Sequence, residues 1–385
     1  MLVLRDDAAA LSAALRQIIA DGPRLVVISG GLGTTHDDVT SESLAAALGR
    51  TLEEDGAALR FVEQRTAELC RRRGLSYDDI LVQTRRQALL PAQSTVVAPA
   101  GAAPGYTLTS AGSIIVVLPG VPSELESMWP VAFSQVASGV EIPLLQRRLV
   151  RIYGVGELQT SAVVAAVPRD DVEVSITASA GEVTIAMVAA LADPGASESL
   201  EQLEADLCQR LPVFSTDGRT VDQIVAGLLQ DRDETVAVGE SCTGGLLSAR
   251  LTDLSGSSAY FVGGAITYSN DAKTRLLDVP ADVLGRHGAV SAETAVAMAE
   301  GARDRTGATY GLATTGIAGP GGATLGKPVG LVYIACAGPR ATGSRRCDLF
   351  GDRDGVRTAA VVAALHLLRV VLHGGTPDPE PEPRA

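Results

Sequence analysis

Apolar residues recur at helical spacing near the N-terminus of the chain. Behind an acidic pair, four of them share one helical face: Leu11, Leu15, Ile18 and Ile19. This pattern predicts a helix that ends at Gly22-Pro23, and the apolar run RLVVIS that follows predicts a buried strand. The loop GGLGTTHDDVT comes next, and we expect a second helix from Ser41. A helix and an apolar strand followed by a glycine-rich loop and a further helix are typical of a parallel α/β layer fold.

The same pattern recurs further along the chain. A strand over Ile114–Leu118 leads through a Pro/Gly turn into a helix that begins near Ser123. The segment TVDQIVAGLLQ has apolar residues at i, i+3, i+4, i+7 and i+8, which predicts a helix. The strand TVAVGE follows it, then a helix over Leu246–Leu251, and the last helix is expected over Val356–Leu372. The sequence therefore predicts α/β architecture at both ends of the chain.

The hydrophobic pattern between these two regions is different. Alternating apolar positions predict two strands around a turn: Val172, Val174 and Ile176, then Val183 and Ile185. This stretch is typical of a small α+β module, and the turn-rich segment FSTDGRT closes it. We expect domains over residues 1–146, 147–215 and 216–374, and a proline-rich acidic tail, 375–385, that is disordered.

Composition narrows the functional classes. A chain of 385 residues is long enough for two or three domains. The net charge of −13 disfavours binding to nucleic acid or to anionic membranes, both of which require basic surface. Five scattered cysteines without a CxxC pair indicate reduced thiols rather than a zinc site. No apolar run approaches the ~18 residues of a membrane span, and the N-terminus is not a signal peptide, so we expect a soluble, cytoplasmic protein with no membrane partner.

The turn ESCTGG is the first candidate for chemistry. The strand before it delivers Ser241 to the N-terminal end of a helix, where free backbone N–H groups can stabilise an oxyanion or hold a phosphate. Gly244 and Gly245 would let a ligand approach the backbone. Taken alone, the segment is equally consistent with a strand–helix turn that a Ser or Thr side chain caps.

Further polar groups follow later strands. The segment FVGGAITYSNDAKTRLL, the loop ATTGIAGPGG with Lys327 after it, and the segment GDRDGVR carry hydroxyls, a lysine and arginines. Loops at the carboxyl ends of parallel strands meet in one crevice, so these groups predict a site for an anionic, phosphorylated substrate. The chain has only four histidines and none near Ser241, so a desolvated, neutral lysine is the expected base for a serine nucleophile.

Simpler interpretations of these residues stay open. Tyr268 is alternatively a core residue with a satisfied hydroxyl, and Lys273 a solvated lysine at the start of a helix. Arg353 is expected to form an ion pair with a neighbouring aspartate rather than to contact substrate. Lys327 is alternatively a residue of an exposed loop, without a role in the site.

The motifs ESCTGG, TYSNDAK, TTGIAGPGG with KPVG, and GDRDGVR occur in the order found in one family. Over about residues 220–372 the chain resembles the C-terminal domain of the CinA (competence/damage-inducible protein) family, also known as the nicotinamide-nucleotide amidase PncC. The resemblance implies hydrolysis of the carboxamide of nicotinamide mononucleotide (NMN) to nicotinate mononucleotide and ammonia, without a cofactor, by a protein that is a homodimer. It implies Ser241 as nucleophile, Lys273 as base and Tyr268 as a catalytic partner, with Cys242 only a neighbour. It implies these substrate-binding positions: Thr243, Gly244, Gly245, Asn270, Thr315, Gly316 and Arg357.

The first region resembles the N-terminal domain of the same family, through GGLGTTHDDVT, GAAPG and LPGVPSELESMW. That domain is similar to molybdopterin-binding MoaB/MogA proteins, which implies a three-layer α/β fold, here without the first strand–helix unit of the family. The implied nucleotide-binding residues are Gly30, Gly31, Gly33, Asp38, Pro119 and Gly120. The glycines are suited to cradling phosphate. Asp37 and Asp38 are candidates either to hold a divalent metal or to cap the following helix.

The middle region, with RIYGVGE, resembles the family's KH-like connecting domain, although it lacks the GXXG loop of RNA-binding KH domains. Three functions thus follow from the sequence. The first is the serine amidase, the second is a metal-dependent ADP-ribose pyrophosphatase in the N-terminal domain, and the third is a non-catalytic module in competence or DNA-damage responses.

Overall fold

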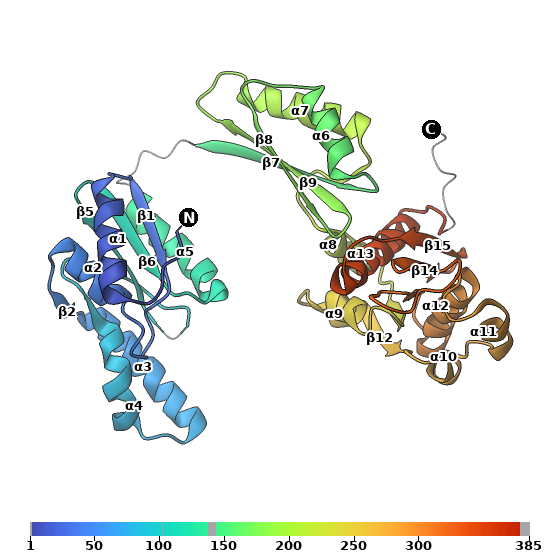
Figure 1. The fold of residues 1–385 in the computed structure, drawn as a ribbon, viewed down its shortest axis with the longest axis horizontal. Coiled ribbons are helices and arrows are strands. Elements are labelled where there is room, and N and C mark those ends of the chain that lie inside the picture. The colour runs from blue at the N-terminus through green and yellow to red at the C-terminus, as the bar shows by residue number, and fades with distance from the viewer. Residues whose placement is uncertain (1, 102, 138–143, 378–385) are drawn as a thin grey trace. The chain divides into compact units, whose positions relative to one another are not determined.

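The chain divides into two compact units, Met1–Ile142 and Pro143–Ala385 (Figure 1). The computed structural model describes residues 2–101, 103–137 and 144–377, so most of the tail predicted to be disordered lies outside the described residues. The middle module and the C-terminal domain share the second unit rather than forming separate units. Strand β7 begins at Leu145, two residues before the start of the middle domain predicted over residues 147–215.

The N-terminal unit combines a mixed sheet with helices. Its helices are α1 (Ala8–Ala20), α2 (Thr40–Leu48), α3 (Gly56–Arg73), α4 (Tyr77–Thr84), the short η1 (Arg85–Ala88) and α5 (Pro122–Val136). Its strands are β1 (Leu25–Ser29), β2 (Leu52–Glu54), β3 (Leu89–Pro91), β4 (Thr95–Val97), β5 (Gly105–Ser110) and β6 (Ser113–Leu118). The main sheet has the order β1-β6-β5-β4, in which only β1 and β6 pair in parallel, and β2 pairs with β3 separately.

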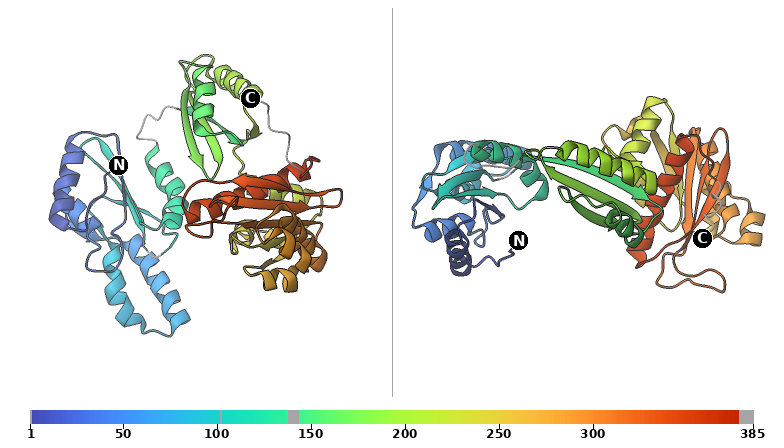
Figure 2. Two further views of the ribbon diagram at one scale, coloured as in Figure 1. Left: turned by 45° about the vertical axis from the view of Figure 1, so that its right-hand side comes forward. Right: turned by 90° about the horizontal axis from the view of Figure 1, so that it is seen from above.

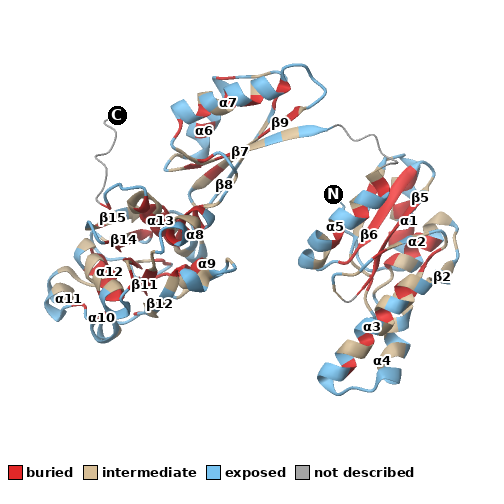
Figure 3. Ribbon diagram, turned by 180° about the vertical axis from the view of Figure 1, so that it is seen from behind, coloured by how far each residue is buried: buried red, intermediate tan, exposed pale blue. Residues whose placement is uncertain are grey.

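Strand β6 explains the layering of this unit, since it is buried along its whole length (Figure 3). Alternate side chains of a strand point to opposite faces of the sheet. Ile115 and Val117 pack with residues of α1, α2 and α3, whereas Ile114, Val116 and Leu118 pack with α5. The predicted three-layer α/β fold is confirmed.

The middle module is a small α+β structure. It contains β7 (Leu145–Tyr153), α6 (Glu157–Ala165), β8 (Glu173–Ser179), β9 (Glu182–Ala190), α7 (Ala196–Arg210) and β10 (Val213–Ser215). The strands form an antiparallel sheet in the order β10-β7-β9-β8, and the two helices pack on one of its faces (Figure 2). Its likeness to a KH domain stays a prediction.

The C-terminal domain is a second α/β structure. Its helices are α8 (Val221–Asp231), α9 (Leu246–Thr252), the short η3 (Ser257–Ala259), α10 (Asn270–Leu277), α11 (Ala281–His287), α12 (Ala292–Thr306) and α13 (Arg353–Leu372). Its strands are β11 (Val236–Glu240), β12 (Phe261–Ile266), β13 (Tyr310–Gly316), β14 (Leu331–Ala337) and β15 (Thr342–Asp348). The sheet order is β12-β11-β13-β14-β15. Strands β12, β11 and β13 pair in parallel, and β14 pairs antiparallel with both of its neighbours, β13 and β15.

Side-chain size differs between the two faces of this sheet. Bulky residues such as Val238 and Ile334 pack with α8, α9 and α13, while small residues such as Ala313 and Ala335 pack with α10 and α12. Among the described residues, α13 is the one helix long and apolar enough to cross a membrane, and 61% of its most apolar window is buried inside the fold. Burial in this core accounts for the apolar composition of α13 (Figure 3).

Strand β11 lies at the point where the chain changes direction in the sheet. From β11 the chain passes first to β12 on one side and later to β13 on the other. Ligands of open α/β sheets bind outside the carboxyl ends of strands at such a point. The carboxyl end of β11 is Glu240, so Ser241 occupies this position.

Candidate active site

The nucleophile predicted from the sequence faces a buried lysine. Lys273 Nζ donates a hydrogen bond to Ser241 Oγ at 3.0 Å and to the carbonyl oxygen of Thr267 at 2.7 Å. Helix α10 supplies the lysine, and its N-cap Ser269 fixes the start of that helix by accepting from Ala272 N–H. The interpretation of Lys273 as a solvated lysine is wrong, because the residue is only 1% exposed.

Burial also sets the electrostatics of the pair. Desolvation lowers the pKa of Lys273 to about 8, because the charged form loses its hydration. A substantial fraction of Lys273 is therefore neutral near physiological pH and able to accept a proton. Ser241 is 9% exposed, so it lies at the edge of the buried region. This geometry suits a serine nucleophile with a lysine base.

Cys242 beside the serine is not activated. Burial raises the pKa of its thiol to about 11, although the N–H groups of Cys242 and Thr243 and the charge of Lys273 act in the opposite direction. A thiol with that pKa is protonated near neutral pH and is a poor nucleophile. The structure thus supports the expectation that Cys242 is only a neighbour of Ser241.

Glu240 is a group that the sequence interpretation missed. Its carboxylate is fully buried and accepts five hydrogen bonds: from Thr243 Oγ1, Gly245 N, Leu247 N, Ser248 N and Ser248 Oγ, at 2.6–3.1 Å. These donors surround the N-terminus of α9, where a negative charge is favoured by the helix dipole. The signal was present in the sequence, since an acidic residue directly precedes the turn into the helix.

This carboxylate corrects the expectation that the turn has generally free N–H groups. The N–H groups of Gly245, Leu247 and Ser248 are held by Glu240, and that of Ser241 donates to the Thr314 carbonyl at 3.0 Å. Gly244 N–H donates to the Ser241 carbonyl. Within the described part of the chain, the N–H groups that donate to no oxygen in this turn are those of Cys242 and Thr243.

Arg357 contacts the turn directly, and Arg353 contacts groups beside it. Arg357 donates from Nε to the Cys242 carbonyl at 3.2 Å and from Nη2 to the Thr243 carbonyl at 2.8 Å. Arg353 donates to the Gly319 carbonyl at 2.7 Å and to Tyr268 Oη at 2.8 Å. The expectation that Arg353 pairs with a neighbouring aspartate is therefore wrong.

Tyr268 lies at the surface of the site. Its side chain is 61% exposed, so the interpretation as a core residue is wrong. A methyl group added to Gly244 would lie 3.6 Å from Arg357 Nη2 and 4.0 Å from Tyr268 Cε2, which places both side chains over the turn. A pocket of about 660 Å³ adjoins them, lined by Ala318, Gly319, Pro320, Val329, Gly351, Asp352, Arg353, Asp354 and Arg357. Tyr268 and Arg357 therefore both lie near Gly244, and their roles in catalysis and substrate binding stay predictions.

Other predicted binding residues have structural partners. Thr243 Oγ1 is buried against Glu240 and Thr314, and Thr315 Oγ1 donates to the Ala289 carbonyl at 2.6 Å. Neither hydroxyl is directed to an open site, so their assignment to substrate binding is not supported by their contacts.

Two further positions complete the predicted set. Gly316 allows close approach of β14, since a Cβ there would lie 2.6 Å from Val332 Cγ2. Asn270, in contrast, is exposed in the first turn of α10, where the structure leaves it accessible to a ligand. Packing thus explains Gly316, while a binding role for Asn270 stays a prediction.

The predicted loops of the N-terminal unit also meet. A Cβ on Gly120 would lie 3.1 Å from the Cα of Gly30, so the loop after β1 contacts the loop after β6. Gly31 and Gly33 leave room for the side chains of Thr40 and Asp38 respectively. Pro119 belongs to the same junction, where its carbonyl accepts from Ser29 Oγ at 3.4 Å. Nucleotide binding by these loops stays a prediction.

The Asp37-Asp38 pair does not cap helix α2, because its N-cap is Val39. Instead Asp38 Oδ2 accepts from Thr35 N at 2.9 Å and from Thr35 Oγ1 at 2.6 Å. Burial raises the pKa of Asp38, but these hydrogen bonds outweigh burial and hold the pKa below its ordinary value. No group of three or more His, Cys, Asp or Glu side chains suited to a metal occurs among the described residues. A metal at this pair stays a prediction.

Comparison with protein families matches both ends of the chain. Residues 218–372 match the CinA C-terminal domain, and residues 1–138 match the probable molybdopterin binding domain.

Similar proteins extend over nearly the whole chain. A CinA-like protein of Mycolicibacterium vanbaalenii is 40% identical over 385 residues, covering 96% of this chain and 89% of that protein. A putative competence-damage inducible protein of Desulforudis audaxviator is 38% identical, covering 97% and 90%. Among solved structures, the competence/damage inducible protein CihA of Agrobacterium tumefaciens is 37% identical, with a TM-score of 0.38, covering 42% of this chain and 99% of that one.

Proposed function

The chain belongs to the CinA family, and on this premise we propose that its C-terminal domain is a serine amidohydrolase that releases ammonia from the carboxamide of NMN. One observation carries the proposal. The Nζ atom of a fully buried lysine, Lys273, lies 3.0 Å from the hydroxyl oxygen of Ser241 at the switch point of the sheet. Burial favours the neutral form of a lysine, and a general base must lie within hydrogen-bond reach of the proton that it takes, so the position of Lys273 suits that role.

The first half of the reaction forms an acyl-enzyme. Neutral Lys273 takes the hydroxyl proton of Ser241 as Oγ bonds to the carboxamide carbon, and the carbonyl oxygen becomes an oxyanion. The N–H groups of Cys242 and Thr243, which donate to no oxygen among the described residues, are the candidate donors to that oxyanion. The C–N bond then breaks, and the protonated lysine returns its proton to the departing nitrogen, which leaves as ammonia.

The second half uses water as the nucleophile. Lys273 removes a proton from water, the hydroxide adds to the ester carbon, and the bond to Ser241 Oγ breaks. The proton on Lys273 passes to Oγ, which restores the free enzyme, and the carboxylic acid product releases its own proton to water and leaves as the carboxylate. No step requires a metal or a redox partner.

The surroundings of the pair suit a pyridine nucleotide. NMN carries a phosphate at one end and a cationic pyridinium ring at the other. Arg353 lines the adjoining pocket and offers positive charge for the phosphate. The exposed ring of Tyr268 offers a π face to the pyridinium. The pocket volume of about 660 Å³ is within the range of small-ligand sites.

Ammonia release from NMN by the purified full-length chain tests the proposal. We expect Ser241→Ala to lower kcat by at least about 10³-fold, as for other enzymes that lose a covalent nucleophile. Cys242→Ala, at the next position, is the matched control and should keep near wild-type turnover. Wild-type turnover by the Ser241→Ala protein would refute the mechanism, and binding of NMN without ammonia release by the wild type would favour a non-catalytic module.

A further inference from the structure

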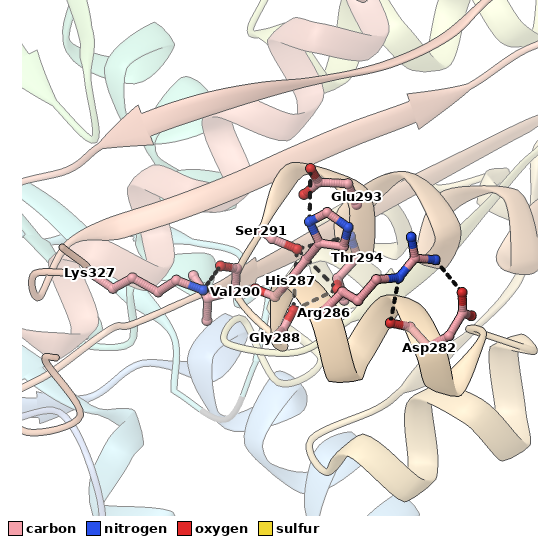
Figure 4. A network of polar contacts seen from close by, with 9 residues as sticks. All are labelled: Asp282, Arg286, His287, Gly288, Val290, Ser291, Glu293, Thr294 and Lys327. Atoms are coloured by element: carbon pink, nitrogen blue, oxygen red, sulfur yellow. Dashed lines mark hydrogen bonds and ion pairs between the residues drawn. The ribbon is translucent and has the colours of Figure 1, made fainter. Parts of the chain in front are cut away.

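Lys327 makes contacts unlike those of an exposed loop lysine. Its Nζ donates to the carbonyl oxygens of His287 at 3.0 Å and Val290 at 2.7 Å, in the segment that joins α11 to α12 (Figure 4). The residue is half-buried although its neighbours in the loop are exposed. An ammonium group held by two carbonyls ties two distant segments of the chain together, since 40 residues separate Lys327 from His287.

The segment over residues 287–290 is rigidly held by side chains. The Gly288 carbonyl lies between the two carbonyls that Lys327 binds. It accepts from Thr294 Oγ1 at 2.7 Å and from Ser291 Oγ at 3.2 Å. The next carbonyl, that of Ala289, accepts from Thr315 Oγ1 at 2.6 Å. The two carbonyls between those that Lys327 binds are therefore held by other side chains, which makes this segment a suitable anchor for Lys327.

Lys327 belongs to the loop over residues 317–330, between β13 and β14. The ends of the loop are closed by hydrogen bonds from Ile317 N to Leu331 O and from Gly330 N to Ile317 O, at 2.9 and 2.8 Å. Near its tip, Thr324 and Lys327 exchange two backbone hydrogen bonds of 3.0 Å each. The Lys327 side chain links this tip to the segment over residues 287–290.

The same loop forms one wall of the pocket that Arg357 lines, and Arg357 donates to the carbonyls of Cys242 and Thr243 in the turn after Ser241. Ala318, Gly319, Pro320 and Val329 line that pocket, and the Gly319 carbonyl accepts from Arg353, which also donates to Tyr268. Lys327 itself is not part of the lining. A shift of the loop would move the wall and the carbonyl that orients Arg353, but not the β11 and α10 elements that carry the nucleophile and the base.

We infer that Lys327 is a positioning residue for substrate binding, which holds the 317–330 loop against the 287–290 segment and so sets the wall of the pocket and the orientation of Arg353. The inference rests on the proposed function of the site. Loss of the contact weakens binding of the nucleotide, while the chemistry at Ser241 is retained.

The variant Lys327→Met removes the donors and keeps the aliphatic stem. We expect the KM for NMN to rise about tenfold with kcat within about threefold of wild type, because ground-state and transition-state binding are lost together. Hydrogen–deuterium exchange should increase in peptides from residues 317–330 and 287–291. Arg286→Met is the matched control: Figure 4 shows Arg286 in the same region, paired with the exposed Asp282, and neither KM nor exchange should change.

Three outcomes overturn the inference. An unchanged KM with unchanged exchange means that Lys327 does not hold the loop. A lower melting temperature with a lower active fraction but an unchanged KM means a purely structural role. A large fall in kcat at unchanged KM means that Lys327 acts in the chemistry.

The inference can still be tested if the amidase proposal fails or if the Lys327→Met variant does not fold. If the wild type releases no ammonia from NMN, the amidase proposal fails, while exchange and calorimetric binding of NMN still test the loop. If Lys327→Met does not fold, Lys327→Gln, which retains an N–H donor, replaces it, and an intermediate rise in KM is expected. Wild-type KM and exchange in the Gln variant would count against the anchor.

Discussion

Lys273 Nζ lies 3.0 Å from Ser241 Oγ, although the two residues are 32 positions apart in the sequence. Strands β11 and β12 pair in parallel, so the turn after β11 and the helix after β12 begin at the same edge of the sheet. The contact is therefore a direct consequence of the topology, and burial at this edge gives the lysine its lowered pKa.

The rate of amide hydrolysis should depend on the protonation of Lys273. Only the neutral amine accepts the serine proton, so kcat/KM should rise about tenfold per pH unit below the pKa of about 8 and level off above it. A pH–rate profile with NMN measures this. Lys273→Arg should be inactive across the range, since the guanidinium stays protonated. A profile that falls between pH 6 and 8 would contradict a lysine base.

The Cys242 thiol should be dispensable. It is protonated near neutral pH because burial raises its pKa to about 11, and it is only 5% exposed. We expect Cys242→Ala to keep at least half of the wild-type kcat and iodoacetamide to leave the native enzyme active. Activity assays before and after alkylation check this, with mass spectrometry to locate the label. Complete inactivation on labelling of Cys242 alone, reproduced by the alanine variant, would make the thiol a participant.

Glu240 should hold the nucleophile turn together. Substitution by Gln replaces one acceptor oxygen by an NH₂ group, which cannot accept from the surrounding N–H and O–H donors. Because those donors then lose their partner, we expect a loss of about 3 kcal/mol in the free energy of unfolding. Urea denaturation followed by circular dichroism measures this. Glu293→Gln is the control, because that side chain is 50% exposed, and it should change stability by less than about 0.5 kcal/mol. Equal effects of the two substitutions would show that the Glu240 network is not stabilising.

The contact between the middle module and the C-terminal domain should weaken in acid. His366, 2% exposed, stacks on Tyr153 at 3.7 Å and its Nε2 lies 2.7 Å from Glu182 Oε1, with Arg369 on its other side. Burial lowers the pKa of His366, and Glu182 opposes this. The unfolded chain therefore binds the proton first, so the stabilisation is complete above the unfolded pKa of about 6.5 and is lost as the pH falls below it.

Urea midpoints of the wild type and His366→Gln at pH 7.5 and 5.5 test this linkage. The wild type should lose more stability than the variant between the two values, because the variant lacks the titrating group. A wild type that gains stability relative to His366→Gln in acid would show that the ion pair with Glu182 outweighs burial.

Local patterns were sufficient for most of the secondary structure. The helix behind the acidic pair is α1, capped by Asp7, and the i, i+3, i+4 pattern of TVDQIVAGLLQ is α8, capped by Thr220. These elements depend on residues close in the sequence, so their pattern predicts them. The start of β7 at Leu145 is less evident from the sequence, because the strand begins among polar residues.

The sequence by itself determined the α/β architecture, because strand ends and helix starts follow from local periodicity, and its resemblance to one family implied Ser241 with Lys273 as the candidate pair. Only the tertiary structure decided which groups are available. It directed the Glu240 carboxylate into the N–H groups expected to be free, turned Arg353 toward Gly319 and Tyr268, and placed Lys327 against the 287–290 carbonyls. Burial and hydrogen-bond direction depend on contacts between residues far apart in the chain, and no local pattern encodes those contacts.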